Sequence, residues 1–371
     1  MKVALVHDHL TQAGGAERVL EALQAIWPQA PTFTLLYDKK ALGNTFGHRE
    51  IRPSFLQSIP ILHKKTRWLL PLMPTATESH NLSGFDVIIS SSSAFSKGII
   101  PPSDAIHICY CHTPTRYLWS DTHDYVRELN LPWPLKKLLP LLLSQMRIWD
   151  YQSANRVDFF IANSDTVRRR IKKYYQKESD VIHPPVDIDQ FSISDAPKNY
   201  YLIGGRLVSY KRYDLVIDAF NKTGQPLKIF GTGPAEKEMR RRAMSNIEFL
   251  GLVSDEERAR LFQDAIAFLH PHEEDFGITA IESMAAGRPV IAYRKGGALE
   301  TVIDGKTGVF FDEQSPEELA DTVMRFDHTA FNPKEIRQHA EQFALPIFHK
   351  KINDYVTEKW EQHKRKTLGL L

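Results

Sequence analysis

Short apolar runs recur along the chain, and polar loops followed by amphipathic segments separate them. Such runs are typical of strands in a parallel sheet, where both faces of a strand are buried. The amphipathic segments carry apolar residues at three- and four-residue steps, which predicts helices that cover the sheet. The pattern therefore predicts an α/β protein with strands at residues 3–6, 85–89, 106–111, 158–162, 200–203, 227–230 and 265–269, and with a long amphipathic helix over 345–360.

The alternation of strands and helices falls into two blocks. At 371 residues the chain is longer than a single hydrophobic core usually serves. Between the blocks, the segment 183–189 contains two adjacent prolines, which hold the backbone in non-helical conformations. We predict one domain over residues 1–185, a second over 186–344, and a terminal helical segment over 345–371.

The stretch over residues 270–289 holds the densest set of candidate chemistry. Glu274 lies in the loop after a predicted strand, and Glu282 lies about two turns into the helix that follows. A solvated acidic loop would give the same local pattern, so spacing alone leaves both interpretations open. Unpaired backbone N–H groups at the helix start would suit phosphate or sugar oxygens, and they belong to Gly277, Ile278 and Thr279.

Two glycine turns follow predicted strands. Gly14 and Gly15 precede a helix, and glycine there lets the backbone approach a phosphate closely, although a plain turn has the same form. The second turn, at Gly231 and Gly233, lacks the third glycine of a dinucleotide fingerprint and is interrupted by Pro234. An NAD-dependent dehydrogenase or epimerase would need that fingerprint, so this alternative is disfavoured.

Charged and titratable side chains also lie at predicted strand ends. His112 follows the run 106–111, and a single histidine at such a place is more often structural than catalytic. Arg206 and Lys211 follow the run 200–203, where two fixed cations could neutralise charge on a departing diphosphate. An unrelated surface pair is the alternative.

Several motifs resemble, in order, those of the retaining family 4 glycosyltransferases, which have the GT-B fold of two facing Rossmann-like domains. The resemblance implies that fold, with a C-terminal helix that crosses back to the first domain. It also implies that His112, in the string HTPTRYLW, lies beside the donor sugar. The motifs are Gly14-Gly15-Ala16-Glu17-Arg18, Gly205-Arg206-Leu207 with Lys211, Glu274 with Phe276, Gly277 and Glu282, and Gly296-Gly297-Ala298-Leu299-Glu300.

The resemblance assigns roles to individual residues. Glu274, His112, Arg206 and Lys211 are expected to act on the reacting sugar and the diphosphate, while Glu282 is expected to bind the ribose hydroxyls. Histidine could hydrogen-bond the sugar or handle a proton. The expected nucleotide-sugar-binding set is Gly14, Gly15, Arg206, Lys211, Gly231, Leu252, Val253, Glu274, Phe276, Gly277, Ile278, Thr279 and Glu282.

The acceptor side is predicted from fewer residues. Asp8 is placed near the acceptor, and Arg116 either meets an acceptor phosphate or pairs with a local carboxylate such as Asp121. We expect transfer of a hexose from a nucleoside diphosphate sugar to a glycan or a polyprenyl-linked glycan. GDP-mannose is the first choice of donor because HTPTRYLW and GGAERV resemble bacterial mannosyltransferases of surface polysaccharide assembly, and a UDP-hexose is second. A non-catalytic nucleotide-sugar sensor would keep the same binding residues.

Composition and charge narrow the setting. The formal net charge of +2 gives no reason to expect a nucleic-acid partner, and no metal is expected because the scheme needs no Asp-x-Asp motif. The two cysteines, Cys109 and Cys111, indicate a reduced, cytoplasmic environment, and the polar start of the chain does not resemble a signal peptide. Basic residues beside Trp and Leu in residues 49–75 and 131–149 suggest peripheral contact with an anionic membrane, although a core with a lysine rim is the alternative.

Overall fold

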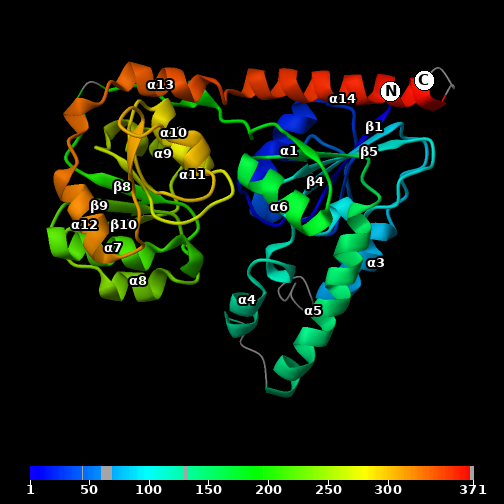
Figure 1. The fold of residues 1–371 in the computed structure, drawn as a ribbon, viewed down its shortest axis with the longest axis horizontal. Helices are drawn as coiled ribbons and strands as arrows, with labels where there is room; N and C mark the ends of the chain where they lie inside the picture. Colours follow the sequence, from blue (N-terminus) through cyan, green and yellow to red (C-terminus); the bar gives the residue numbers. More distant parts are fainter. Residues whose placement is uncertain (44, 60–68, 129–132, 195, 368–371) are drawn as a thin grey trace. The chain divides into compact units, whose positions relative to one another are not determined.

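The computed structural model describes residues 1–43, 45–59, 69–128, 133–194 and 196–367 (Figure 1). The chain divides into two compact units, of which the first comprises Met1–His183 and Phe348–Leu371 and the second comprises Pro184–Ile347. Each unit is built on its own parallel sheet, as the alternation of apolar runs predicts.

The first unit contains a seven-stranded sheet in the order β3-β2-β1-β4-β5-β6-β7. Every pairing in it is parallel, so all the strands end at the same edge of the sheet. The strands are β1 (Val3–His7), β2 (Thr32–Thr34), β3 (Ile51–Pro53), β4 (Val87–Ser92), β5 (Ile106–Cys111), β6 (Phe159–Ala162) and β7 (Ser179–Val181). The α-helices of this unit before the linker are α1 (Gly15–Ile26), α2 (Lys39–Leu42), α3 (Met73–Glu78), α4 (Thr122–Glu128), α5 (Trp133–Ala154) and α6 (Asp165–Tyr175).

The second unit contains a six-stranded parallel sheet in the order β10-β9-β8-β11-β12-β13. Its strands are β8 (Tyr201–Gly204), β9 (Leu227–Phe230), β10 (Ile247–Gly251), β11 (Phe268–His270), β12 (Val290–Tyr293) and β13 (Gly308–Phe311). Its α-helices are α7 (Tyr213–Thr223), α8 (Glu236–Arg242), α9 (Asp255–Asp264), α10 (Ile278–Ala285), α11 (Ala298–Thr301), α12 (Pro316–Arg325) and α13 (Pro333–Glu341). Short 3-10 helices add η1 (Phe55–Ser58), η3 (Ser96–Gly98) and η4 (Arg116–Leu118) to the first unit and η5 (Ile188–Gln190), η6 (Ser209–Lys211) and η7 (His328–Ala330) to the second.

The last helix, α14 (Leu345–Thr367), begins in the second unit and packs on the first for most of its length (Figure 1). Phe348 contacts Tyr110 edge to face, at a centroid distance of 5.9 Å. Farther along, the Tyr355 hydroxyl donates to Asp180 and the His363 ring bonds the backbone oxygen of Asp104. Of the residues that the amphipathic pattern places on one side of this helix, Phe348, Ile352 and Val356 are buried. Tyr355 is partly buried and Ile347 is 38% exposed.

Helix α6 illustrates how local sequence sets an element. Ser164 caps its N-terminus by accepting a hydrogen bond from the Val167 N–H, which satisfies one of the unpaired donors of the first turn. Ile171 is fully buried, while the basic residues around it lie on the outer side of the helix. The basic run is therefore a solvated helix face.

The two segments considered for membrane contact are only partly described. Lys64, Lys65, Arg67 and Trp68 lie outside the described residues. Over residues 136–149, leucines lie on both sides of α5, since Leu139 and Leu143 are buried whereas Leu138 and Leu141 are exposed. Among the helices that the structure describes, none has the length and apolar character needed to cross a bilayer.

Candidate active site

The strand ends of the second unit bring together Lys211 and Glu274, a lysine and a glutamate from separate loops. Lys211 ends η6, and its Nζ lies 3.2 Å from Oε1 of Glu274 in the loop after β11. Burial alone would raise the pKa of Glu274, but Lys211, followed by His272, holds it well below its usual range. Burial likewise opposes the charge on Lys211, yet Glu274 raises its pKa overall. Both groups are therefore charged at neutral pH.

Two histidines share the loop with Glu274. His270 is the last residue of β11, and its pKa falls to about 3 because the ring is buried, so the imidazole is neutral. Nε2 of His272 lies 3.4 Å from Oε2 of Glu274, and Nε2 of His270 lies 3.9 Å from the same oxygen. The two carboxylate oxygens thus face different neighbours, with the ammonium at Oε1 and the imidazoles at Oε2.

A glycine turn supports the backbone of this loop. The N–H of Gly297 donates to the backbone oxygen of Glu274 at 2.8 Å. A Cβ on Gly297 would lie 2.4 Å from Cα of Phe276, so a side chain there would displace the loop. Gly277 has φ of 92°, a left-handed conformation that glycine adopts without strain, and it directly precedes α10. The Gly296-Gly297 turn therefore holds the backbone of Glu274 in place.

Helix α10 carries Glu282 into the protein interior. Glu282 is almost completely buried, and its Oε1 lies 3.6 Å from Nη2 of Arg258 on α9. The side chain of Phe276 packs against Phe343 inside the hydrophobic core. Phe276 was expected to bind the nucleotide sugar, but its ring is unavailable for that role because it is 3% exposed. The ring instead anchors the loop to the hydrophobic core.

The remaining expected nucleotide contacts of the second unit lie at neighbouring strand ends. The N–H of Gly231 donates to the backbone oxygen of Gly251, and a Cβ on Gly231 would lie 1.9 Å from the backbone oxygen of Gly205. Arg206 is exposed next to this junction. Leu252 is 81% exposed beyond β10, and Val253 is partly buried. The turns after β8, β9 and β10 are therefore packed backbone against backbone, with side chains directed outward at Arg206 and Leu252.

The first unit holds a separate chain of polar contacts at its own sheet edge. Nε2 of His112 bonds the Ser91 hydroxyl at 2.7 Å, and the same hydroxyl lies 3.1 Å from Nδ1 of His7. On its other side, Nε2 of His7 lies 3.7 Å from a carboxylate oxygen of Glu17. Burial lowers the pKa of His112 to about 3, so its imidazole is neutral at physiological pH. A neutral ring favours hydrogen bonding over proton donation as its role.

The glycine turn of the first unit differs in detail from the expected form. Helix α1 begins at Gly15, and Gly14 is its N-cap in an extended conformation. A Cβ on Gly14 would lie 2.9 Å from Oε2 of Glu17, so the carboxylate occupies the space beside the turn. A diphosphate at this helix start would meet that negative charge.

The structure gives Asp8 a role other than the predicted contact with an acceptor. Its two carboxylate oxygens accept hydrogen bonds from four successive backbone N–H groups, at 2.6 to 2.8 Å. Burial alone would raise the pKa of Asp8, but His9, His7 and these bonds lower it overall. Two oxygens that each accept two bonds have no lone pair left for a ligand, so Asp8 anchors the turn after β4. The donors belong to Ser93, Ala94, Phe95 and Ser96.

Arg116 takes the second of its two predicted roles, because its Nε donates to Asp121 at 2.8 Å.

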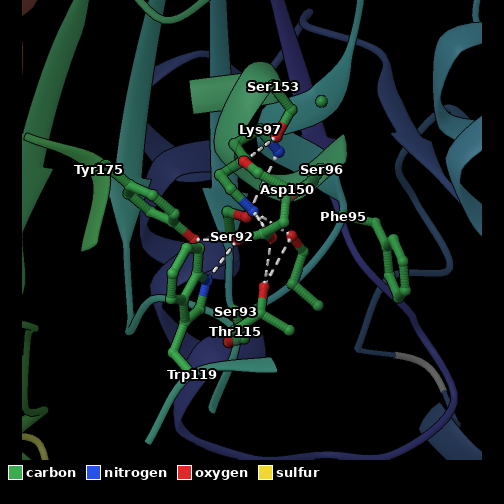
Figure 2. Close-up of polar contacts among 12 residues, drawn as sticks. Ser92, Ser93, Phe95, Ser96, Lys97, Thr115, Trp119, Asp150, Ser153 and Tyr175 are labelled. Carbon is green, nitrogen blue, oxygen red and sulfur yellow. Dashed lines mark hydrogen bonds and ion pairs between the residues drawn. The ribbon is translucent and has the colours of Figure 1, made fainter. Parts of the chain in front are cut away.

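The segment HTPTRYLW is held in place by a buried aspartate on α5, as Figure 2 shows. Thr115 and the Trp119 indole both donate to Asp150 at 2.7 Å. The ammonium of Lys97, itself 2% exposed, lies 2.5 Å from the same carboxylate.

Sequence reasoning missed this ion pair and Ser91. Asp150 is the one acidic residue in the sequence of α5 and lies between Trp149 and Tyr151, and Lys97 follows the serine-rich end of β4. An isolated charge amid residues with core character is the signal that could have identified the pair. Ser91 is one of several adjacent serines, and nothing in that run distinguishes it.

Comparison with known proteins bears on both units. The model of the family described as Glycosyltransferase Family 4 matches residues 13–190, and that described as Glycosyl transferases group 1 matches residues 187–343. The D-rhamnosyltransferase WbpZ of Pseudomonas aeruginosa is 31% identical over 243 residues, which are 61% of this chain and 61% of that protein. The O-antigen chain mannosyltransferase C of Escherichia coli is 30% identical over 155 residues, which are 37% of this chain and 40% of that protein. The chain thus spans between 40% and 61% of these two relatives.

Among solved structures, Anabaena Alr3699/HepE in complex with UDP-glucose superimposes with a TM-score of 0.71 at 19% identity, covering 96% of this chain and 100% of that one. This likeness concerns the fold, and it confirms the predicted GT-B architecture of two Rossmann-like sheets with a C-terminal helix. The two family models overlap at residues 187–190 and together extend from residue 13 to residue 343. The chain therefore belongs to the group 1, family 4 glycosyltransferases.

Proposed function

We propose that the protein is a retaining hexosyltransferase that uses a nucleoside diphosphate sugar as donor. The observation that carries this proposal is the Lys211–Glu274 pair at the strand ends of the second unit, where a partly buried ammonium and an ionised carboxylate lie 3.2 Å apart. A cation suits the diphosphate, and a carboxylate suits the hydroxyl groups of a sugar. Arg206, exposed on the adjacent turn, supplies a second cation for the diphosphate.

The proposed chemistry follows from where charge develops. As the bond between the anomeric carbon and the phosphate oxygen breaks, the sugar ring gains positive charge and the leaving diphosphate gains negative charge. Lys211 and Arg206 stabilise the diphosphate, while the carboxylate of Glu274 accepts hydrogen bonds from the sugar. The acceptor hydroxyl then bonds to the anomeric carbon on the same face, and its proton passes to the departing phosphate. Glu274 serves as a binding group in this scheme and forms no covalent intermediate.

Further residues are proposed to complete donor recognition. We assign the ribose hydroxyls to Glu282, and the base to backbone groups near Leu252 and Val253. We propose that His112 hydrogen-bonds the transferring sugar, which agrees with its neutral imidazole. Its Nε2 is engaged by Ser91, so Nδ1 is the nitrogen available for that contact.

For the donor we propose GDP-mannose first and a UDP-hexose second. The first choice is supported by the 30% identity to a mannosyltransferase, and the second by the UDP-glucose bound in a structure of the same fold. The proposed acceptor is a glycan or a lipid-linked glycan. Incubation with GDP-mannose and UDP-glucose in separate reactions tests the proposal. One donor is expected to raise the melting temperature and to be hydrolysed slowly, whereas no shift and no released diphosphate with either would overturn it.

We also propose peripheral contact with an anionic membrane through α5. Figure 1 shows this helix extending away from the sheet of the first unit together with α4. Leu138 and Leu141 are 59% and 67% exposed on it, with Lys136 and Lys137 beside them. Flotation with anionic vesicles at low salt is expected to carry the protein upward. The double variant L138Q/L141Q should stay behind, and equal flotation of both proteins would contradict the role of this face.

A further inference from the structure

His270, His272 and Glu274 present three metal-ligand atoms to one point in the second unit. The candidate ligand atoms of the three side chains all lie within 4.8 Å of one another. Their chemistry, two imidazole nitrogens and one carboxylate oxygen, is a set that zinc binds in many proteins. We propose that these three residues form a binding site for a divalent ion of the zinc type.

The distances are close to those that tetrahedral coordination requires. With bonds of about 2.0–2.1 Å to each ligand, two ligand atoms of a tetrahedral zinc ion lie roughly 3.4 Å apart. Nε2 of His272 is 3.4 Å from Oε2 of Glu274, and Nε2 of His270 is 3.9 Å from it. The third pair, the ligand nitrogens of His270 and His272, lies within 4.8 Å, so the two rings would move toward each other on binding an ion.

Apart from their approach to Oε2 of Glu274, the two histidine rings have no polar partner among the described residues that would account for their burial. His270 is 1% exposed and His272 is 5% exposed, and within the described part of the chain none of their four ring nitrogens has a hydrogen-bond partner. Buried polar atoms are nearly always satisfied, so two such rings side by side call for an explanation. Their centroids are 4.7 Å apart. An ion shared between them satisfies one nitrogen of each ring.

The neighbouring lysine does not block the site but weakens it. Lys211 contacts Oε1 of Glu274, so Oε2 is the oxygen left for the ion. The ammonium nevertheless repels a second cation nearby. Imidazole nitrogen also selects against magnesium, which prefers oxygen ligands and keeps its water shell. No metal is expected here from the sequence alone, because a His-x-His-x-Glu spacing becomes a ligand set only once β11 ends at His270.

Isothermal titration of ZnCl₂ into chelator-treated, dialysed full-length protein tests the site, with Co²⁺ absorption as a second reading of the ligand geometry. The chain has 15 histidines, so weak surface binding is expected and matched variants are needed. His272→Gln should weaken the tightest binding step at least tenfold, whereas His48→Gln, which removes an exposed histidine in the other unit, should leave it unchanged. Lys211→Met should tighten binding, because it removes the adjacent positive charge. Equal affinity in the wild type and His272→Gln, or no binding step of one ion per chain, would overturn the proposal.

One consequence rests on the proposed function. An ion on Oε2 withdraws Glu274 from the donor sugar, so Zn²⁺ should inhibit glycosyl transfer in the wild type and inhibit His272→Gln at least tenfold less strongly. The two proposals fail separately. A protein that binds one zinc ion but transfers no sugar contradicts the proposed function alone, and an active protein that zinc neither binds nor inhibits contradicts the metal site alone.

Discussion

Replacement of Lys211 by methionine tests the diphosphate assignment most directly. The substitution keeps the length of the side chain and removes its charge. Lys211 is 13% exposed, so its ammonium acts in a medium with less screening than bulk water. At an effective dielectric constant of about 20, a unit charge roughly 4 Å from another contributes about 4 kcal/mol. Each 1.36 kcal/mol of lost transition-state stabilisation costs a factor of about 10 in rate.

The expected loss in kcat/KM is therefore about 10²- to 10³-fold, somewhat below the full value because solvent and Arg206 compensate in part. Lys211→Arg should recover part of the activity, since it restores the charge with a different shape. Lys222→Met is the matched control, because Lys222 pairs with Glu317 on an exposed surface of the same unit. Initial rates with the preferred donor, and melting curves to verify folding, provide the measurement. If Lys211→Met retained a rate within threefold of the wild type, the lysine could not be the group that stabilises the leaving diphosphate.

Further predictions concern the first unit. Asp150→Ala should lower the free energy of unfolding by about 3–5 kcal/mol in a urea titration, because it leaves the buried ammonium of Lys97 unpaired. His112→Ala should lower kcat/KM through a loss of about 1–3 kcal/mol in transition-state stabilisation. Unchanged kinetics would show that His112 has a structural role. Burial lowers the pKa of His107 to about 3 from 6.5, so the unfolded chain binds a proton at this ring below pH 6.5 while the folded protein does not. The free energy of unfolding should consequently fall by up to about 1.4 kcal/mol per pH unit as pH drops from 6.5 toward 3, and the slope should be shallower in His107→Gln.

Strand positions could be predicted from sequence where burial is two-sided. The apolar run 106–111 coincides with β5, and the run 227–230 coincides with β9, since a central strand of a parallel sheet needs apolar residues on both faces. Strand β11 lies farther along than its apolar run, because the preceding residues form the connection from α9. Edge strands β3 and β7 contain polar residues and leave no such signal.

Helix α5 was not predicted, for two physical reasons. It contains Pro140, which removes a backbone donor from the helix interior and usually indicates a break. Its leucines also face both ways, since Leu139 is buried and Leu138 is exposed, so the apolar residues do not form the single stripe on which helix prediction depends. A pattern with leucines on both sides does not by itself distinguish a helix from other buried apolar segments.

The sequence predicts which residues of the candidate site lie at strand ends, but it predicts less well where their side chains point. The sequence indicates that Glu274 and Lys211 follow strands of one sheet, and the structure brings them to 3.2 Å. The sequence cannot indicate whether a side chain turns inward. Phe276 was therefore assigned to the ligand although its ring lies in the core. Side-chain direction depends on packing partners that are distant in sequence, and Phe343 is one of them.

The three carboxylates Asp8, Asp150 and Glu274 explain why burial alone does not identify a binding residue. Asp8 accepts four backbone N–H bonds, and Asp150 accepts bonds from Lys97, Thr115, Trp119 and Tyr175. A carboxylate has about four lone-pair positions, so the fold itself saturates both of these groups. Glu274 differs, because its neighbours within the described residues are one ammonium and two imidazoles, and no backbone donor bonds its side chain. It keeps acceptor capacity at Oε2, and a sugar hydroxyl or a metal ion would use that same oxygen. Competition between the donor and Zn²⁺ in the wild type would therefore demonstrate that both ligands depend on one carboxylate.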